Sequence, residues 1–287
     1  MVWQALANGL VMGSLYALVA AGLTLVFGVL RIINVAHGDF LMLAMYGYFF
    51  LQQKLGLDPY LSILIVTPLL FGLGNVVFRV FIRPVIDDPP MSKLLITMGL
   101  SLILANGALF LFAADYRSLT LSYGQSKFTV GNVNLTWTEA AVFVGSLSIT
   151  GALYWILRRT SLGRHIRAVA QSREAAALAG VDVFRIYALS FSIGAACAGI
   201  AGGLLMPIYY VYPEVGLMFL LIAFVVIVLG GMGNFGGALA GGLIIGVVES
   251  ISGLYMPGSS APLVIFVVFI AILLVRPQGL LSRGPAS

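Results

Sequence analysis

The sequence contains few charged residues and almost no cysteine. Only 9% of its 287 residues are charged, 61% are hydrophobic, and Cys197 is the single cysteine. Soluble domains carry about a quarter charged residues. A soluble fold of this length would therefore leave too much apolar surface in water, and we expect lipid to be the solvent for most of the chain. One cysteine excludes a disulfide framework and a cysteine metal site.

Three further absences narrow the classes of protein. The period-two alternation typical of outer-membrane barrels is missing. The phosphate-binding pattern G-x-x-x-x-G-K-S/T does not occur, so we expect this chain to bind no ATP. The first ten residues, MVWQALANGL, contain no basic stretch and no small-residue cleavage pattern, so we predict that the first apolar segment is retained as a span rather than cleaved as a signal peptide.

Long apolar segments dominate what remains, and helices of about 20 apolar residues span a membrane. The segments lie at about 9–30, 38–53, 60–78, 93–113, 138–157, 186–208, 215–232, 236–255 and 261–275. We therefore predict an all-α polytopic membrane protein with eight to nine transmembrane helices, some of them broken. The polar connection 114–137 is expected to form an extended lid or a short hairpin.

Basic residues predict the orientation, because they are enriched in cytoplasmic loops. One predicted side holds only Lys54, Arg117 and Lys127. The other holds Arg31, Arg79, Arg83, Lys93, Arg158, Arg159, Arg164, Arg167, Arg173, Arg185, Arg276 and Arg283. We predict an N-terminus outside, a C-terminus inside and a cytoplasmic loop at about 158–185. Because the basic residues cluster at the ends of apolar runs, the sequence pI near 9.4 does not indicate a nucleic-acid partner.

The stretch RIINVAHGDF interrupts two apolar segments with polar residues. It places Asn34, His37, Gly38 and Asp39 within six residues. One interpretation is a helix break that lines a translocation path, in which Gly38 permits the turn and Asn34 satisfies freed backbone groups. His37 and Asp39 would then orient each other or the break. The other interpretation is a tight cytoplasmic turn in which Asp39 caps the next helix. His37 has no second metal ligand at a useful spacing, so we expect no metal site.

A second interruption, GGMGNFGG at 230–237, separates another pair of short apolar segments. Paired interrupted segments in the two halves of a transporter indicate the substrate path. Gly231, Gly233 and Asn234 are therefore candidate path residues. Glu249 is an acidic residue inside a predicted span, so it either lines the path or is hydrogen-bonded between helices, for example to Ser250 or Ser252.

The charged loop 158–191 contains two short predicted helices. Thr160 or Ser161 caps the first, and Ser172 caps the second, SREAAALAG, which Gly180 ends. Ala175, Ala176 and Ala179 would give the second helix a small flat face beside Arg173 and Glu174. This face is suited to docking in a groove of another protein, whereas the alternative is a helix that only touches lipid headgroups.

Two stretches, GLTLVFGVLRIINVAHGDFLMLAMYG and RAVAQSREAAALAGVDVFRIYALSF, closely resemble one family. They are similar to LivH-type permease subunits of branched-chain amino-acid ABC importers, and the resemblance covers the whole chain, 1–287, as one transmembrane domain. It places Asn34, His37, Gly38 and Asp39 in the family's membrane motif. It places Glu174, Ala175, Ala176 and Gly180, next to Arg173, in the motif of the ATPase-coupling helix.

The resemblance also implies partners and a location. A homologous permease would complete a heterodimer, two cytoplasmic ATPase subunits would bind and use ATP, and an external solute-binding protein would deliver substrate. The chain itself would be a non-catalytic subunit of the bacterial inner membrane that binds no cofactor. Branched-chain or other hydrophobic amino acids are the expected substrates.

Three alternatives stay open at this point. The same family includes urea and short-amide permeases. Asp39 and Glu249 in the interrupted helices also suit an ion-coupled secondary transporter. A membrane enzyme that uses His37 and Asp39 is disfavoured, because no nucleophile lies beside them in the sequence.

Overall fold

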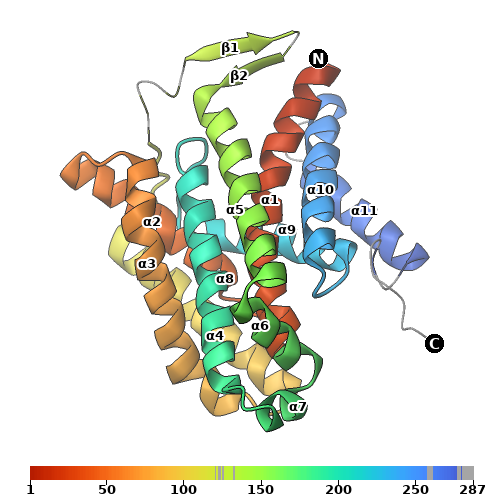
Figure 1. The fold of residues 1–287 in the computed structure, drawn as a ribbon. Coiled ribbons are helices and arrows are strands. Elements are labelled where there is room, and N and C mark those ends of the chain that lie inside the picture. Colours follow the sequence, from red (N-terminus) through yellow and green to blue (C-terminus); the bar gives the residue numbers. More distant parts are fainter. Residues whose placement is uncertain are drawn as a thin grey trace.

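The computed structural model describes residues 1–119, 121, 124, 126–131, 133–256, 261–276 and 279. Within these residues the chain forms a helical bundle with one small β-hairpin (Figure 1). The helices are α1 (Val2–Leu30), α2 (His37–Leu55), α3 (Pro59–Val77), α4 (Pro90–Phe112), α5 (Trp137–Arg159), α6 (Ser161–Gln171), α7 (Arg173–Leu178), α8 (Val183–Leu205), α9 (Val215–Gly230), α10 (Phe235–Tyr255) and α11 (Ala261–Val275). A π-helical turn, Phe78–Ile82, and a 3-10 turn, Arg83–Val85, extend α3.

Each of the nine predicted apolar segments coincides with a helix, which confirms an all-α polytopic membrane protein. In the described part of the chain, six helices are long and apolar enough to cross a membrane, namely α1, α3 with its extension, α4, α5, α8 and α10. The helices α9 and α11 are apolar but shorter. The structure thus establishes six full-length spans among the described residues, fewer than the eight to nine expected. By length and composition alone, α2, α9 and α11 do not count as membrane-crossing helices.

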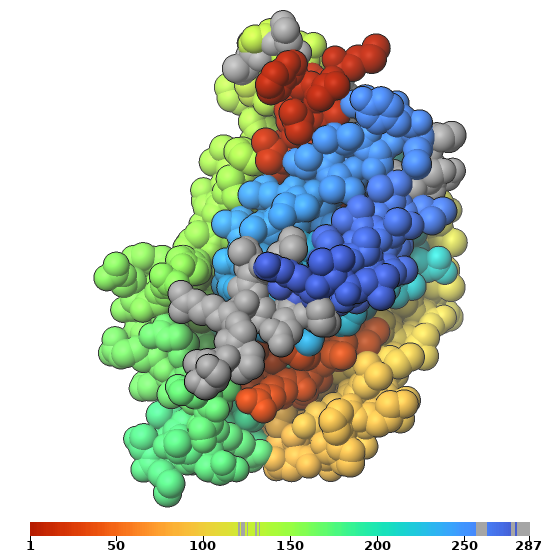
Figure 2. Space-filling model, turned by 90° about the vertical axis from the view of Figure 1, so that its right-hand side faces the viewer, coloured from red at the N-terminus to blue at the C-terminus, as the bar shows by residue number. Residues whose placement is uncertain are grey.

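The core forms around α1, which packs against α10, α8, α5 and α9. Glycines bring α1 and α10 together backbone to backbone: a Cβ added at Gly13 would lie 2.8 Å from the Gly242 carbonyl oxygen, and one at Gly9 would lie 2.8 Å from that of Gly246. Small residues allow such close helix contact in membranes. The outer helices are far less covered, and α4 buries only Thr97, Leu100 and Ala108. Figure 2 shows α10 and α11 in blue across the upper and central part of one face of the molecule.

The hairpin and the loop helices lie at opposite ends of the bundle. Strands β1 (Lys127–Val130) and β2 (Val133–Thr136) pair antiparallel at the end that holds the N-terminus, and α6 and α7 lie at the other end (Figure 1). Gln4 holds the hairpin to α1, because its side chain donates to the Asn134 carbonyl oxygen and accepts from the Asn134 N–H, both at 2.8 Å. The expected short hairpin within 114–137 is confirmed.

Candidate functional site

Residues 31–36 form the first break, between α1 and α2. Arg31 ends α1 in the left-handed conformation, with φ 54°, and its N–H donates to the Phe27 carbonyl oxygen at 2.8 Å. The break lies beside the first half of α4, where the Thr97 hydroxyl donates to the Ile33 carbonyl oxygen at 3.0 Å. Asn34 and Asp39 are 1% and 4% exposed. These two side chains therefore face the interior of the bundle, whereas Arg31 and Ile33 in the same break are exposed.

Asp39 does not cap α2, so the capping interpretation is wrong. The N-cap residue is Ala36, and no side chain caps this helix end. His37 and Asp39 do not orient each other either: the His37 Nε2 lies 3.2 Å from the Val19 carbonyl oxygen and ties α2 to α1. Asn34 Oδ1, His37 Nδ1 and Asp39 Oδ2 are buried without a hydrogen-bond partner in the described part of the chain. The first break thus concentrates unsatisfied polar atoms.

Gly38 has a packing role rather than the expected role in the turn. It lies inside α2 and its φ is not positive. A Cβ at Gly38 would lie 1.9 Å from the Gly216 carbonyl oxygen, and a Cβ at Gly216 would lie 2.6 Å from that of Gly38. The two glycines therefore let the start of α2 and the start of α9 touch through their backbones.

Residues 231–234 form the second break, between α9 and α10. Gly231 and Gly233 have φ 92° and 84°, conformations that favour glycine. The Asn234 Oδ1 accepts from the Gly237 N–H at 3.2 Å and caps α10. The glycine and asparagine signals in the sequence thus correspond to an actual interruption with a capped restart.

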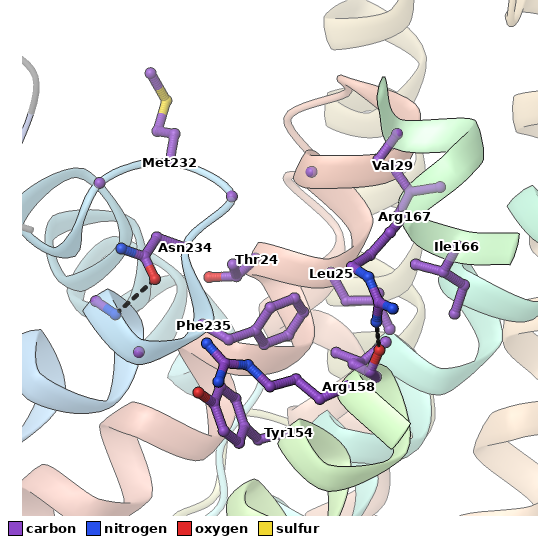
Figure 3. Close-up of a pocket in the computed structure, with 17 residues that line it drawn as sticks. Thr24, Leu25, Val29, Tyr154, Arg158, Ile166, Arg167, Met232, Asn234 and Phe235 are labelled. Atoms are coloured by element: carbon purple, nitrogen blue, oxygen red, sulfur yellow. Dashed lines mark hydrogen bonds between the residues drawn. The ribbon is translucent and has the colours of Figure 1, made fainter. Parts of the chain in front are cut away.

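A cavity of about 720 Å³ lies against the second break, between α1, α5 and α6 (Figure 3). We call it the Arg158 cavity. Arg158 reaches across it over the Tyr154 ring, 4.7 Å from the ring centre, and Thr24 faces it with a buried hydroxyl that has no partner among the described residues. Arg167 lines the same cavity and donates to the Leu157 carbonyl oxygen. No pattern in the sequence distinguishes Thr24 or Tyr154 as a site residue.

A second cavity, of about 560 Å³, lies against the first break, between α2, α4 and the start of α9. We call it the Asp39 cavity. Asp39 and Ser101 border it near the middle of α4, whereas Tyr116, Tyr212 and Glu214 border it beyond the end of α4. The beginning of α4 follows the turn that contacts α7, so the Asp39 cavity extends toward the end of the bundle opposite α7. Ser101, a polar residue in an apolar span, was the available signal for this site.

Glu249 borders neither cavity. Its neighbour is the Tyr16 hydroxyl of α1, with which it is hydrogen-bonded, and its Oε2 is buried without a partner among the described residues. Ser252, one of the two expected partners, donates instead to the Val248 carbonyl oxygen at 2.6 Å. The structure thus favours a link between α1 and α10 and separates Glu249 from both breaks.

The loop helices α6 and α7 have the expected caps. The hydroxyl of Thr160 accepts from the Gly163 N–H, and that of Ser172 accepts from the Ala175 N–H, each at 3.2 Å. Gly180 follows α7 with φ 80°.

The proposed flat face of α7 needs a correction. Ala176 is buried, 4% exposed, against the body of the protein, so it cannot belong to a free docking face together with Ala175 and Ala179. The exposed residues here are Glu174, Ala175, Ala177, Leu178 and Ala179, and Leu178 is 91% exposed. Leu178 was not identified from the sequence.

Arg173 fixes α7 to the turn that follows α3. Its guanidinium donates to the Asp87 carboxylate and lies 5.4 Å from the centre of the Phe184 ring. The Arg83 guanidinium lies 5.1 Å from the centre of the same ring. The hydrogen bond from Arg173 holds the pKa of Asp87 below its ordinary value, and the same bond raises the pKa of Arg173. This contact sets the position of α7 relative to the turn.

The sequence model of the family described as "Branched-chain amino acid transport system / permease component" matches residues 5–273. The chain belongs to this permease family. It is 35% identical to the high-affinity branched-chain amino acid transport system permease protein LivH of Salmonella typhimurium and 34% identical to LivH of Escherichia coli K12. It is 33% identical to BraD, the permease protein of Pseudomonas aeruginosa. In all three cases 98% of this chain and 95% of the relative are covered. No solved structure matches the chain.

Membership of the permease family confirms the resemblance found in the sequence. It also confirms the expected role as a non-catalytic transport subunit. The comparisons assign no role to the residues of the two breaks or of α7, so these assignments rest on the geometry described above.

The permease offers a direct test of the contact between α7 and the turn. The substitution Arg173→Gln should raise the pKa of Asp87 back toward its ordinary value, because the hydrogen-bonded guanidinium of Arg173 is lost. Any stability from this exposed pair is present above the ordinary pKa of aspartate, about 3.9, and is lost as the pH falls through the lowered value. Carboxyl-carbon NMR of labelled Asp87 measures the titration. Arg185→Gln, an exposed control on α8, should leave it unchanged; an unchanged titration in Arg173→Gln would contradict the pairing.

Proposed function

We propose that this chain is a membrane-spanning permease subunit of an ATP-driven importer for branched-chain or other hydrophobic amino acids. The observation that carries the proposal is the similarity to LivH and BraD over nearly the whole length of both chains. The relatives are named for branched-chain amino acid transport, which favours this substrate class over urea or short amides.

The proposed substrate path uses both breaks. The Asp39 cavity reaches the first break from one end of the bundle, and the Arg158 cavity reaches the second break from the other. Irregular backbone at membrane depth is tolerated where it is covered by protein or borders a cavity. Asp39 and the second-break residues Gly231, Gly233 and Asn234 would border the path, whereas Asn34, His37 and Gly38 would hold the first break in place. Glu249 would act more remotely, through its contact with Tyr16.

The proposed orientation places the N-terminus and the hairpin outside and α6 and α7 in the cytoplasm. Arg158, Arg159, Arg164 and Arg167 lie in or next to α6, which agrees with the enrichment of basic residues in cytoplasmic loops. Eight to nine helices would then cross the membrane, the shorter ones within the bundle. Arg283, one of the basic residues of the predicted cytoplasmic C-terminus, lies outside the described residues.

The proposed partners follow from the two ends of the molecule. Two cytoplasmic ATPase subunits would bind ATP and dock on α7, and a solute-binding protein would deliver the amino acid at the hairpin end. A homologous permease would form the other half of the path, in the bacterial inner membrane. This chain would bind no cofactor of its own.

Uptake by a reconstituted complex tests the proposal. Vesicles that contain both permeases and the ATPases should accumulate leucine only when ATP and the liganded binding protein are present, and collapse of proton and sodium gradients should have no effect. Vesicles with this chain alone should take up none. Gradient-driven uptake by this chain alone would instead establish an ion-coupled carrier, and uptake of urea or acetamide but not leucine would overturn the substrate assignment.

A further inference from the structure

We infer that the Asp39 cavity is the subsite that receives the ammonium group of the amino acid on its way to the first break. The inference rests on the proposed function and names the recognition chemistry of its path. Its main evidence is Asp39, a carboxylate that is 4% exposed, borders the cavity, and has a buried oxygen without a hydrogen-bond partner in the described part of the chain.

A carboxylate inside a membrane bundle is energetically unfavourable unless it is paired or bordered by water. The polar side chain that contacts Asp39 is that of Ser101, whose hydroxyl is neutral. No basic side chain is among the described residues that border the cavity. The neighbouring His37 is turned toward Val19. A group from outside the chain can supply the missing partner, and a substrate ammonium group offers both a positive charge and hydrogen-bond donors.

The mouth of the cavity has the same preference for cations. Glu214 borders it there, next to Tyr116 and Tyr212, whose ring centres are 4.7 Å apart. Tyrosine faces attract cations through their quadrupole. An ammonium group would thus meet a carboxylate and two aromatic rings at the mouth and a second carboxylate at the inner end.

Apolar side chains border the passage between the two carboxylates, among them Met98, Leu102, Ala105 and Leu109 of α4. They can contact an aliphatic side chain along its length, in keeping with a pocket in which a few polar groups fix the orientation. An amino acid would therefore enter with the ammonium group leading. Urea carries no charge and an organic acid carries only a negative one, so neither uses this arrangement.

A thiol probe in the cavity measures its charge preference without any transport. The single natural cysteine, Cys197, is buried, so Ala105→Cys introduces the accessible thiol and leaves the Asp39–Ser101 contact intact. In the assembled complex, two reagents are compared: the cationic trimethylammonium-ethyl methanethiosulfonate and its anionic sulfonate-ethyl analogue. The ratio of the cationic to the anionic reaction rate should be about ten-fold higher at Ala105→Cys than at Thr129→Cys in the exposed hairpin. Asp39→Asn should remove most of this preference, whereas Asp58→Asn, outside the cavity, should preserve it.

Protection by substrates then identifies the ligand group. Saturating leucine and leucine methyl ester, which both carry the ammonium group, should slow the reaction of Ala105→Cys. The deaminated analogue 4-methylpentanoate should not. Equal reactivity toward both reagents, a preference that survives Asp39→Asn, or equal protection by 4-methylpentanoate would overturn the inference.

The same vesicles separate this inference from the proposed function. If wild-type vesicles take up no leucine with ATP while the cation preference and leucine protection persist, the importer assignment fails and the subsite stands. If ATP-driven uptake is normal while Ala105→Cys shows no cation preference, the subsite fails and the importer assignment stands.

Discussion

Replacing Gly38 with alanine is expected to destabilise the permease strongly and to lower its yield in the membrane. The new Cβ would lie 1.9 Å from the Gly216 carbonyl oxygen, and the obstacle is backbone rather than the flexible end of a side chain. Overpacking of a well-packed core typically costs about 1–3 kcal/mol and occasionally more. Here the start of α2 must separate from the start of α9, so we expect the upper end of this range. The measurement is the yield and thermal midpoint of the detergent-solubilised chain, followed by size-exclusion chromatography.

Gly72 provides the matched control, because it lies in the middle of α3 and a Cβ there would have nothing within 4 Å. Gly72→Ala should keep the wild-type yield and thermal midpoint. If Gly38→Ala were as stable as Gly72→Ala but transported poorly, Gly38 would act in the path and not in packing.

Replacing Leu178 with arginine is expected to prevent ATPase docking while the permease stays folded. Leu178 is 91% exposed on α7, and an apolar anchor at the centre of an interface often contributes about 2 kcal/mol or more. That loss corresponds to roughly 30-fold weaker binding, and ATP-driven uptake should fall accordingly. Co-purification of the ATPases and uptake into vesicles are measured on the same preparation.

Two variants make this test specific. Leu55→Arg places the same charge on a 66% exposed leucine at the end of α2 and should leave ATPase binding unchanged. Ala176→Arg should instead lower the thermal midpoint of the permease alone, because Ala176 is the residue of α7 that is buried against the rest of the protein. If the Leu178→Arg permease co-purified with as much ATPase as the wild type, docking of the ATPases on α7 would be contradicted.

Features that depend on neighbouring residues in the chain could be predicted from the sequence. Apolar runs predicted the helices, Thr160 and Ser172 predicted the caps of α6 and α7, and the glycines with Asn234 predicted the second break. In each case the physical cause lies within a few residues, as a side chain that accepts a backbone N–H or a glycine that adopts positive φ.

Features that depend on distant contacts could not be predicted. The surroundings of Asp39 combine α2, the middle of α4 and the segment 212–217, so no local pattern distinguishes a buried carboxylate from a helix cap. Gly38 was assigned to the turn because its partner, Gly216, lies far away in the sequence. The six residues of α7 are too few to show which alanine faces the protein, and this is why Ala176 was placed on the wrong face.

The shortness of α9 has a consequence for how lipids act on this protein. Its 16 residues extend about 24 Å, less than the roughly 30 Å hydrocarbon thickness of a bilayer. Most of α9 is buried against α1, α2 and α10, so hydrophobic mismatch at this helix is hidden from the lipid. The helices α4 and α5, each with 23 residues, are mostly exposed, so we expect their outer faces to contact the acyl chains. A thinner or thicker bilayer should therefore change the tilt of α4 and α5 and leave α9 and the two breaks unchanged.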